Sequence, residues 1–251
     1  MHDPGPHDRP IDPDAYGRAF ADVYDAWYAD LSDPAAVANH VASAAPAGPL
    51  LELGVGTGRL STGFQDHGRT LIGIDTSSSM LNHWTAGDPG AIAARANMAS
   101  LPFAAQSLAG VFVAYNTFFN VITAEAQQQC MHECSRVLQP GGVLVLEAFV
   151  PPPTLDRPEY AISRSRTSAD AAVLIATCEE PAGQTMTGAH LDFGPHGLRV
   201  RPWRIRWCDL EELDQMAGLA GLTLISRFAD WTGSEFGLGA ERHVSTWQLR
   251  I

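Results

Sequence analysis

The sequence predicts an α/β fold in which helices cover both faces of a largely parallel sheet, with an antiparallel β excursion before the end of the chain. Two observations support this prediction. Between residues 49 and 150, five short and nearly all-apolar runs alternate with helical stretches, which is typical of a parallel sheet buried between helices. Beyond the prolines at 151–153, longer and partly alternating segments replace this pattern, and they indicate antiparallel strands.

The chain before the sheet is expected to be a polar tail followed by helices. Residues 1–13 are polar and Pro-rich, so we expect them to be disordered. One helix is expected from residue 14 to residue 31. A second helix follows, because Ser32 or Asp33 can cap it and Pro34 suits its first turn.

The remaining elements follow from apolar runs and the turn residues between them. In the parallel part, strands are expected over residues 49–55, 70–76, 91–98, 109–116 and 143–150, and helices over residues 58–68, 77–84 and 123–138. The turn QPGG leads into the fifth strand. In the excursion, strands are expected over residues 171–180, 185–193 and 198–207, before a helix over 208–221 and two last strands over 222–231 and 241–250.

Composition narrows the class of partner. The formal charge of -12 is spread along the chain, which argues against nucleic acid or an anionic membrane as the partner and favours a small molecule. All 16 basic residues are Arg, so lysine chemistry is excluded. We find no signal peptide and no apolar run as long as a membrane span, and we expect a cytoplasmic protein, a single domain with a cap, that forms a homo-oligomer.

The four cysteines are expected to be thiols. They show no paired CxxC spacing, and a reducing compartment keeps them as thiols. Cys130, His132 and Cys134 suggest a metal site, but on a helix His132 points away from the two cysteines. We therefore expect helix packing, an exposed His132 and no metal.

A Gly-rich loop follows the first strand. The stretch LLELGVGTGRL places Gly54, Gly56 and Gly58 between an apolar run and a helix, so backbone can approach a ligand closely at the helix N-terminus. A dinucleotide fingerprint has the spacing GxGxxG, whereas this loop has GxGxG, preceded by Glu52. The loop therefore predicts a nucleotide-like ligand, and its spacing departs from the dinucleotide fingerprint.

Three further stretches follow in order. In GIDTSSSML, Asp75 ends the second strand, where a carboxylate can accept hydrogen bonds from both hydroxyls of a ribose. ANMASLPF follows the third strand, and RVLQPGGVLVLE forms the turn into the fifth strand. Asp75 and Glu52 also have a structural interpretation, since each carboxylate can hold nearby backbone amides.

Together, these four motifs resemble those of class I S-adenosylmethionine-dependent methyltransferases over residues 50–150. The resemblance implies a Rossmann-like seven-stranded sheet, S-adenosylmethionine as the cofactor, Met80 against the adenine, and Asn97 as the acceptor for its amino group in place of the usual Asp. The cofactor-binding residues that it implies are Glu52, Gly54, Gly56, Gly58, Asp75, Thr76, Met80, Asn97, Met98 and Tyr115. The chain then divides into a disordered N-terminus (1–13), N-terminal lid helices (14–46), a cofactor-binding core (47–150), a β-rich cap insertion (151–207) and the C-terminal part of the core sheet (208–251).

The first helix carries an aromatic stripe. Tyr16, Phe20, Tyr24 and Trp27 recur at helical intervals, with Tyr28 beside them, and such stripes usually pack in a core. The stretch also resembles the N-terminal segment of N-methyltransferases that act on amino sugars and related antibiotic precursors. That resemblance implies that Tyr16 and Tyr24 close over cofactor and acceptor.

The expected acceptor is an amine nitrogen of a secondary metabolite. The stretch YNTFFNVI after the fourth strand brings Asn116 and Phe118 to the ligand edge of the sheet but no His, Asp or Glu. We therefore name Tyr16, Tyr24, Asn116 and Phe118 as candidate catalytic residues. An alternative is an O-methyltransferase with Glu147 or a cap histidine as base, and another is a relative that binds the cofactor without transferring methyl.

Two arginines of the excursion have two interpretations. Arg204 and Arg206 alternate with apolar residues in WRIRW, so they share one face of a strand. We expect a solvated face, because Arg must supply this role where Lys is absent. The alternative is a clamp for a phosphate or carboxylate of the substrate.

Overall fold

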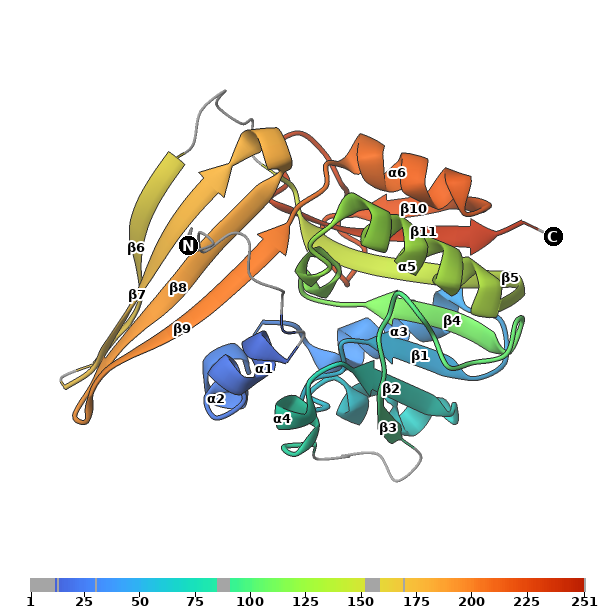
Figure 1. The fold of residues 1–251 in the computed structure, drawn as a ribbon. Helices are drawn as coiled ribbons and strands as arrows, with labels where there is room; N and C mark the ends of the chain where they lie inside the picture. Colours follow the sequence, from blue (N-terminus) through green and yellow to red (C-terminus); the bar gives the residue numbers. More distant parts are fainter. Residues whose placement is uncertain are drawn as a thin grey trace, which may run out of the picture.

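The computed structural model of the chain describes residues 12, 14–29, 31–84, 91–151, 159–168 and 170–250. Nearly all of the segment expected to be disordered, residues 1–13, lies outside these residues. The described chain forms two separate sheets, one of seven strands and one of four (Figure 1). The two short lid helices lie between them, below the smaller sheet in this view.

The seven-stranded sheet confirms the expected α/β fold. Its order is β10-β11-β5-β4-β1-β2-β3, with β1 to β5 parallel and β11 antiparallel to both of its neighbours. The strands are β1 (Leu50–Leu53), β2 (Leu71–Asp75), β3 (Ile92–Arg95), β4 (Leu108–Val113), β5 (Leu138–Phe149), β10 (Leu222–Phe228) and β11 (Arg242–Leu249). The expected turn QPGG belongs to β5, where the register to β4 shifts between Leu108 and Gly110.

Helices cover both faces of this sheet because the central strands β1 and β4 have apolar, buried residues on both faces. Leu51 and Leu53 pack toward α5 and α6, whereas Leu50 packs toward α3 and η1. Both faces are therefore buried, as expected for a parallel sheet. The helices are α3 (Pro34–Ala44), the 3-10 helix η1 (Ser61–His67), α4 (Ser78–Leu81), the 3-10 helix η2 (Thr117–Asn120), α5 (Ala124–Val137) and α6 (Leu210–Leu219).

The β excursion forms an antiparallel cap sheet in the order β6-β7-β8-β9. Its strands are β6 (Glu159–Thr167), β7 (Ala172–Glu180), β8 (Thr185–Gly194) and β9 (Gly197–Arg206), with the 3-10 turn η3 (Pro181–Gly183) between β7 and β8. The last three match the three expected strands. The sequence does not reveal β6, because this edge strand is exposed at every residue and its large apolar side chains are limited to Tyr160 and Ile162.

The expectation of one helix over residues 14–31 is wrong. Two short helices, α1 (Ala15–Phe20) and α2 (Tyr24–Tyr28), replace it. The break has a cause in β9, far along the chain. The Ala19 carbonyl accepts from the Arg201 guanidinium, and Asp22 pairs with the same group at 2.7 Å. These contacts hold the turn between the helices against the cap sheet.

The expectation that the cap arginines lie on a solvated face is also wrong for Arg206, because this residue is 7% exposed. Its guanidinium pairs with Glu212 of α6 at 2.6 Å and donates to Gln127 of α5 and to Gln184. A buried cation needs such partners, because leaving it unpaired costs several kcal/mol, roughly 3 to 5. Arg206 thus joins the cap sheet to the core.

The cysteines and His132 lie as the helix pattern predicts. Cys130 and Cys134 are buried on α5, while His132 is exposed, and all four cysteines are free. Among the described residues, no group of His, Cys, Asp or Glu could hold a metal. In the same part of the chain, no helix combines the length and apolarity that crossing a membrane requires.

Candidate functional site

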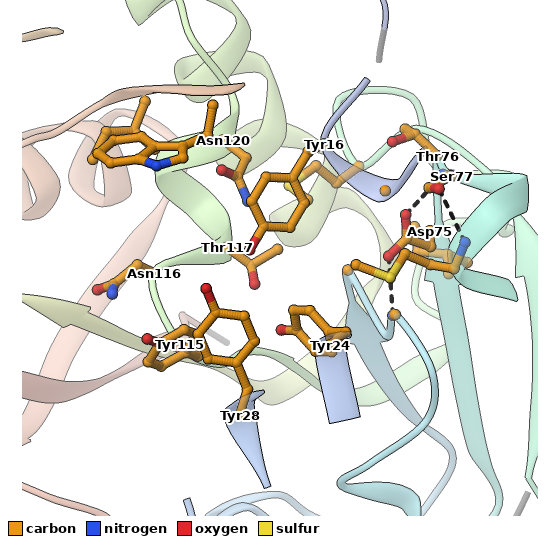
Figure 2. Close-up of a pocket in the computed structure, with 18 of the residues that line it drawn as sticks. Tyr16, Tyr24, Tyr28, Asp75, Thr76, Ser77, Tyr115, Asn116, Thr117 and Asn120 are labelled. Carbon is orange, nitrogen blue, oxygen red and sulfur yellow. Dashed lines mark hydrogen bonds between the residues drawn. The ribbon is translucent and has the colours of Figure 1, made fainter. Parts of the chain in front are cut away.

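A cavity of about 480 Å³ lies where the carboxyl ends of the core strands meet the lid helices and the cap sheet. Figure 2 shows Asp75, Thr76 and Ser77 on one side, Tyr28, Tyr115 and Asn116 on the other, and Tyr16 and Tyr24 between them. Ten residues named from the sequence line it: Tyr16, Tyr24, Gly54, Gly56, Asp75, Thr76, Met80, Met98, Tyr115 and Asn116. The ligand edge of the sheet was thus predictable.

The Gly-rich loop has a backbone that only glycine adopts without strain. Gly54, Gly56 and Gly58 have φ values of 70°, 59° and 86°. Their missing side chains also matter for packing, since a Cβ on Gly54 would lie 2.1 Å from Thr117. The ring of Tyr24 comes within 4.0 Å of the place that a Cβ on Gly56 would take. The loop therefore leaves its backbone open to the cavity, beneath the lid.

Asp75 lies at the centre of the polar side of the cavity. One of its oxygens accepts from the Gly56 N–H at 2.9 Å and the other from the Ser77 N–H at 2.8 Å. Burial raises the pKa of this carboxyl, and these two amide bonds oppose that shift. Each carboxylate oxygen has a second lone pair, so Asp75 holds the loop and still offers two acceptor positions to a ligand.

Four residues named from the sequence lie outside the lining of the cavity. Phe118 is 1% exposed in the core, because the turn before η2 directs it inward. The Asn97 side chain is exposed and accepts from the Ala99 N–H at 2.9 Å. Gly58 packs against Trp84 instead. These three residues therefore support the core and the loops and do not line the cavity.

Glu52 is the fourth of these residues, buried behind the Gly-rich loop. It is 4% exposed, and among the residues that the structure describes one of its carboxylate oxygens has no hydrogen-bond partner. Desolvation raises the pKa of this carboxyl to about 8, with Arg59 opposing the shift and Asp75 adding to it. Glu52 is therefore protonated more readily than an exposed glutamate.

Four tyrosines form one wall of the cavity. The rings of Tyr24 and Tyr28 lie 4.9 Å apart and those of Tyr28 and Tyr115 lie 5.8 Å apart, while Tyr16 and Tyr28 share a hydrogen bond. Burial is the main cause that raises the pKa of each phenol, to about 12 for Tyr28. All four remain neutral donors with aromatic faces. Tyr28 was visible in the stripe but was not assigned to the site.

The turn after β4 is held in a strained shape by β5. Tyr115 and Asn116 have φ values of 48° and 59°, which are uncommon for residues with a side chain. The Tyr115 N–H donates to Glu147 at 2.9 Å, and the Asn116 side-chain oxygen accepts from the Phe149 N–H at 2.6 Å. These bonds hold Tyr115 and Asn116 in the lining of the cavity, and they give Glu147 a structural role.

The cap sheet closes the cavity with residues that the sequence reasoning missed. Its lining residues, two from β8 and two from β9, are Met186, His190, Trp203 and Ile205. In each strand the two share one face, because they are an even number of positions apart. The alternation was visible in the sequence, but nothing there shows which face meets the core.

Comparison with known proteins decides the family. A family model for a methyltransferase domain matches residues 51–146. The solved structure of the CcbJ methyltransferase from Streptomyces caelestis is 32% identical, with a TM-score of 0.87, covering 96% of this chain and 100% of that one. This chain belongs to the S-adenosylmethionine-dependent methyltransferases.

Curated relatives match over shorter stretches or at lower identity. The cypemycin N-terminal methyltransferase of a Streptomyces species is 26% identical over 236 residues, which are 90% of this methyltransferase and 94% of the relative. An uncharacterized protein of Mycobacterium tuberculosis is 34% identical over 157 residues, 61% of this chain. The match covers 51% of that protein, so this chain spans about half the length of its mycobacterial relatives.

The cavity of this methyltransferase fits the cofactor of its family. Asp75 has two acceptor positions for the hydroxyls of a ribose, and the open backbone of the loop at Gly54 and Gly56 can approach the rest of a nucleoside. Met80 and Met98 supply apolar surface beside Asp75, suited to an adenine. When bound, S-adenosylmethionine supplies an electrophilic methyl group on its sulfonium sulfur.

Proposed function

We propose that this methyltransferase transfers the methyl group of S-adenosylmethionine to the amine nitrogen of a small secondary metabolite, such as an amino sugar or an antibiotic precursor. One observation carries the proposal. Among the described residues that line the cavity, Asp75 supplies the one carboxylate, and it is committed to the Gly-rich loop. A neutral amine already has the lone pair that attacks the methyl carbon, whereas a hydroxyl needs a base.

Neither base of the alternative O-methyltransferase is free to act. Glu147 lies outside the lining of the cavity and accepts from the Tyr115 N–H. His190 is a cap histidine that does line it, but its Nδ1 accepts from the Trp203 indole N–H at 3.1 Å. In a neutral imidazole with Nδ1 as the acceptor, the proton is on Nε2, which then cannot take another.

The tyrosine wall supports transfer to an amine through its neutral phenols. The rings of Tyr16, Tyr24 and Tyr28 line the cavity from the lid side. Their electron-rich faces favour a sulfonium or an ammonium by about 0.5 to 2 kcal/mol each. Their hydroxyls can hold the acceptor nitrogen in line, which is the main task of the protein in a single displacement.

The relatives support nitrogen as the acceptor atom. The cypemycin relative is named as an N-terminal methyltransferase, and it matches over 90% of this chain. The test is incubation with methyl-labelled S-adenosylmethionine and a panel of amines, each paired with the alcohol of the same skeleton. Mass spectrometry should find the label on amines. Label on alcohols alone would favour the O-methyltransferase, and label on neither a non-methylating relative.

Replacing Tyr24 by phenylalanine should lower acceptor turnover at least tenfold, because a positioning contact of about 1.4 kcal/mol is lost in the transition state. The ring remains over Gly56, so the melting temperature and the affinity for S-adenosylmethionine should not change. Tyr160→Phe on the exposed strand β6 makes the same chemical change outside the cavity and serves as control. Wild-type turnover in Tyr24→Phe would assign this residue to packing alone.

Glu147→Gln should keep turnover within a few-fold, because an amide oxygen still accepts from the Tyr115 N–H. Glu147→Ala should lose much more, since it frees the strained turn. In the wild type and in Glu147→Gln, the rate should rise with pH through the ionisation of the amine substrate, which reacts as its free base. Steady-state rates across pH 6 to 10 test this. A loss of three decades in Glu147→Gln alone would identify Glu147 as a base.

A further inference from the structure

A tryptophan–histidine pair of the cap sheet forms the roof of the cavity. Trp203 and His190 both line it, and the indole N–H of Trp203 donates to His190 Nδ1 at 3.1 Å. Gly188 makes this contact possible. A Cβ at Gly188 would lie 2.3 Å from the indole, so the ring crosses β8 only because that position has no side chain.

The ring of His190 is fixed from the other side by the lid. Its centroid lies 5.1 Å from that of Phe20 and 5.8 Å from that of Trp27. Arg201 is the cross-strand neighbour of His190 and is paired with Asp22 and Asp192. The imidazole is thus held between the two lid rings and the indole of the cap.

The imidazole of His190 is neutral at physiological pH. Burial lowers its pKa below the usual range, and the cations Arg201 of β9 and Arg166 of β6 lower it further. The nearby carboxylates, Asp22 and Asp192, accept from Arg201 instead. With Nδ1 engaged as an acceptor, the neutral ring carries its proton on Nε2, which has no partner among the described residues.

We propose that His190 is a specificity-determining residue whose Nε2–H donates to an oxygen of the acceptor molecule, with Trp203 as the positioning residue that fixes the tautomer. This inference rests on the proposed function, because it concerns the molecule that receives the methyl group. It assigns to that molecule a hydroxyl, ether or carbonyl oxygen in addition to its amine.

A second donor lies on the core side of the cavity and points to the same class of substrate. Asn116 lines the cavity and uses its side-chain oxygen to accept from the Phe149 N–H, so its NH₂ group is left as the donor that it can offer to a ligand. Among the described lining residues there is no Arg, and Arg206, once a candidate clamp, is paired with Glu212. Two neutral donors without a cation fit uncharged oxygens better than a carboxylate or a phosphate.

The first test needs no acceptor. Protein with ¹⁵N-labelled histidine is studied by NMR as its S-adenosylhomocysteine complex, and the His190 signals are assigned by their loss in His190→Gln. We expect a proton on Nε2 and none on Nδ1 at about pH 8, above the usual histidine pKa. Trp203→Phe should mix the two tautomers. A proton on Nδ1 in the wild-type complex would overturn the proposal.

The second test uses the amine found by the labelled-cofactor assay. His190→Leu should raise KM for it about tenfold with kcat nearly unchanged, because an oxygen loses its donor on binding. His190→Gln should restore KM to within about threefold, since its amide NH₂ can replace Nε2–H. An analogue of the amine without the oxygen should bind wild type and His190→Leu equally.

The outcomes separate this proposal from the proposed function. An unchanged KM in His190→Leu would overturn the donor role, even if amines are methylated. A loss of kcat in both variants, with KM preserved, would assign His190 to the chemical step instead. If no amine is methylated, the proposed function fails, while the NMR result still decides whether His190 presents a donor. Melting temperature and S-adenosylhomocysteine affinity show that each variant is folded.

Discussion

Replacing Asp75 by alanine should weaken S-adenosylmethionine binding by roughly 2 to 3 kcal/mol, about 30- to 150-fold, without unfolding the chain. The loss has two parts. The carboxylate no longer accepts from the ribose hydroxyls that the family cofactor presents. It also no longer accepts from the Gly56 and Ser77 N–H groups, so the Gly-rich loop and the start of α4 lose a shared partner.

Calorimetry with matched variants separates these parts. Asp75→Asn keeps one oxygen as an acceptor and should lie between wild type and Asp75→Ala. Asp66→Ala removes the same charge from an exposed position on η1 and should bind as wild type does. Unchanged affinity in a folded Asp75→Ala variant would contradict the ribose assignment. Tighter binding of NAD than of S-adenosylhomocysteine would contradict the assignment of the cofactor.

Replacing Glu52 by glutamine should stabilise the protein without cofactor at alkaline pH, by at most about 5 kcal/mol. In the folded state desolvation raises the pKa of Glu52 to about 8, whereas an exposed carboxyl ionises near 4.5. As the pH rises, the unfolded chain therefore loses this proton at a lower pH than the folded protein does. Wild-type stability falls as the pH rises from about 4.5 to 8, and the neutral amide does not share that fall.

Denaturant unfolding at pH 5, 7 and 8.5 measures this difference. Near pH 5 wild type and Glu52→Gln should be close in stability, and the gap should widen with pH. Glu159→Gln, on the exposed edge strand β6, removes the same charge from a solvated position and should show no such trend. A constant gap across pH would mean that Glu52 ionises normally in the folded protein.

The core was predictable because its signals are local. Strands that are apolar on both faces predict a buried parallel sheet, and the spacing of Gly54, Gly56 and Gly58 separates this loop from a dinucleotide site. Asp75 follows from its place at the end of β2, where the ligand edge lies. Each of these inferences uses only residues that are close in sequence.

The parts that failed depend on contacts between distant segments. Arg201 breaks the lid helix at Ala19 from 182 residues away, so no helical period could reveal the break. Arg206 looks like a surface residue in its strand, but α5 and α6 supply its partners. His190 and Trp203 reach the cavity only because the cap sheet docks over the lid. Alternation gives the two faces of a strand, and tertiary docking decides which face meets the ligand.

The most direct measurement of the central claim is tandem mass spectrometry of the product formed with methyl-labelled S-adenosylmethionine, together with the amount of S-adenosylhomocysteine released. If the cavity presents a neutral amine to the methyl group, the label is found on nitrogen, and one S-adenosylhomocysteine forms for each methyl transferred. Label on oxygen would contradict transfer to an amine, which we propose because the described lining of the cavity offers no free base for a hydroxyl. Cofactor binding without any S-adenosylhomocysteine would contradict methyl transfer itself.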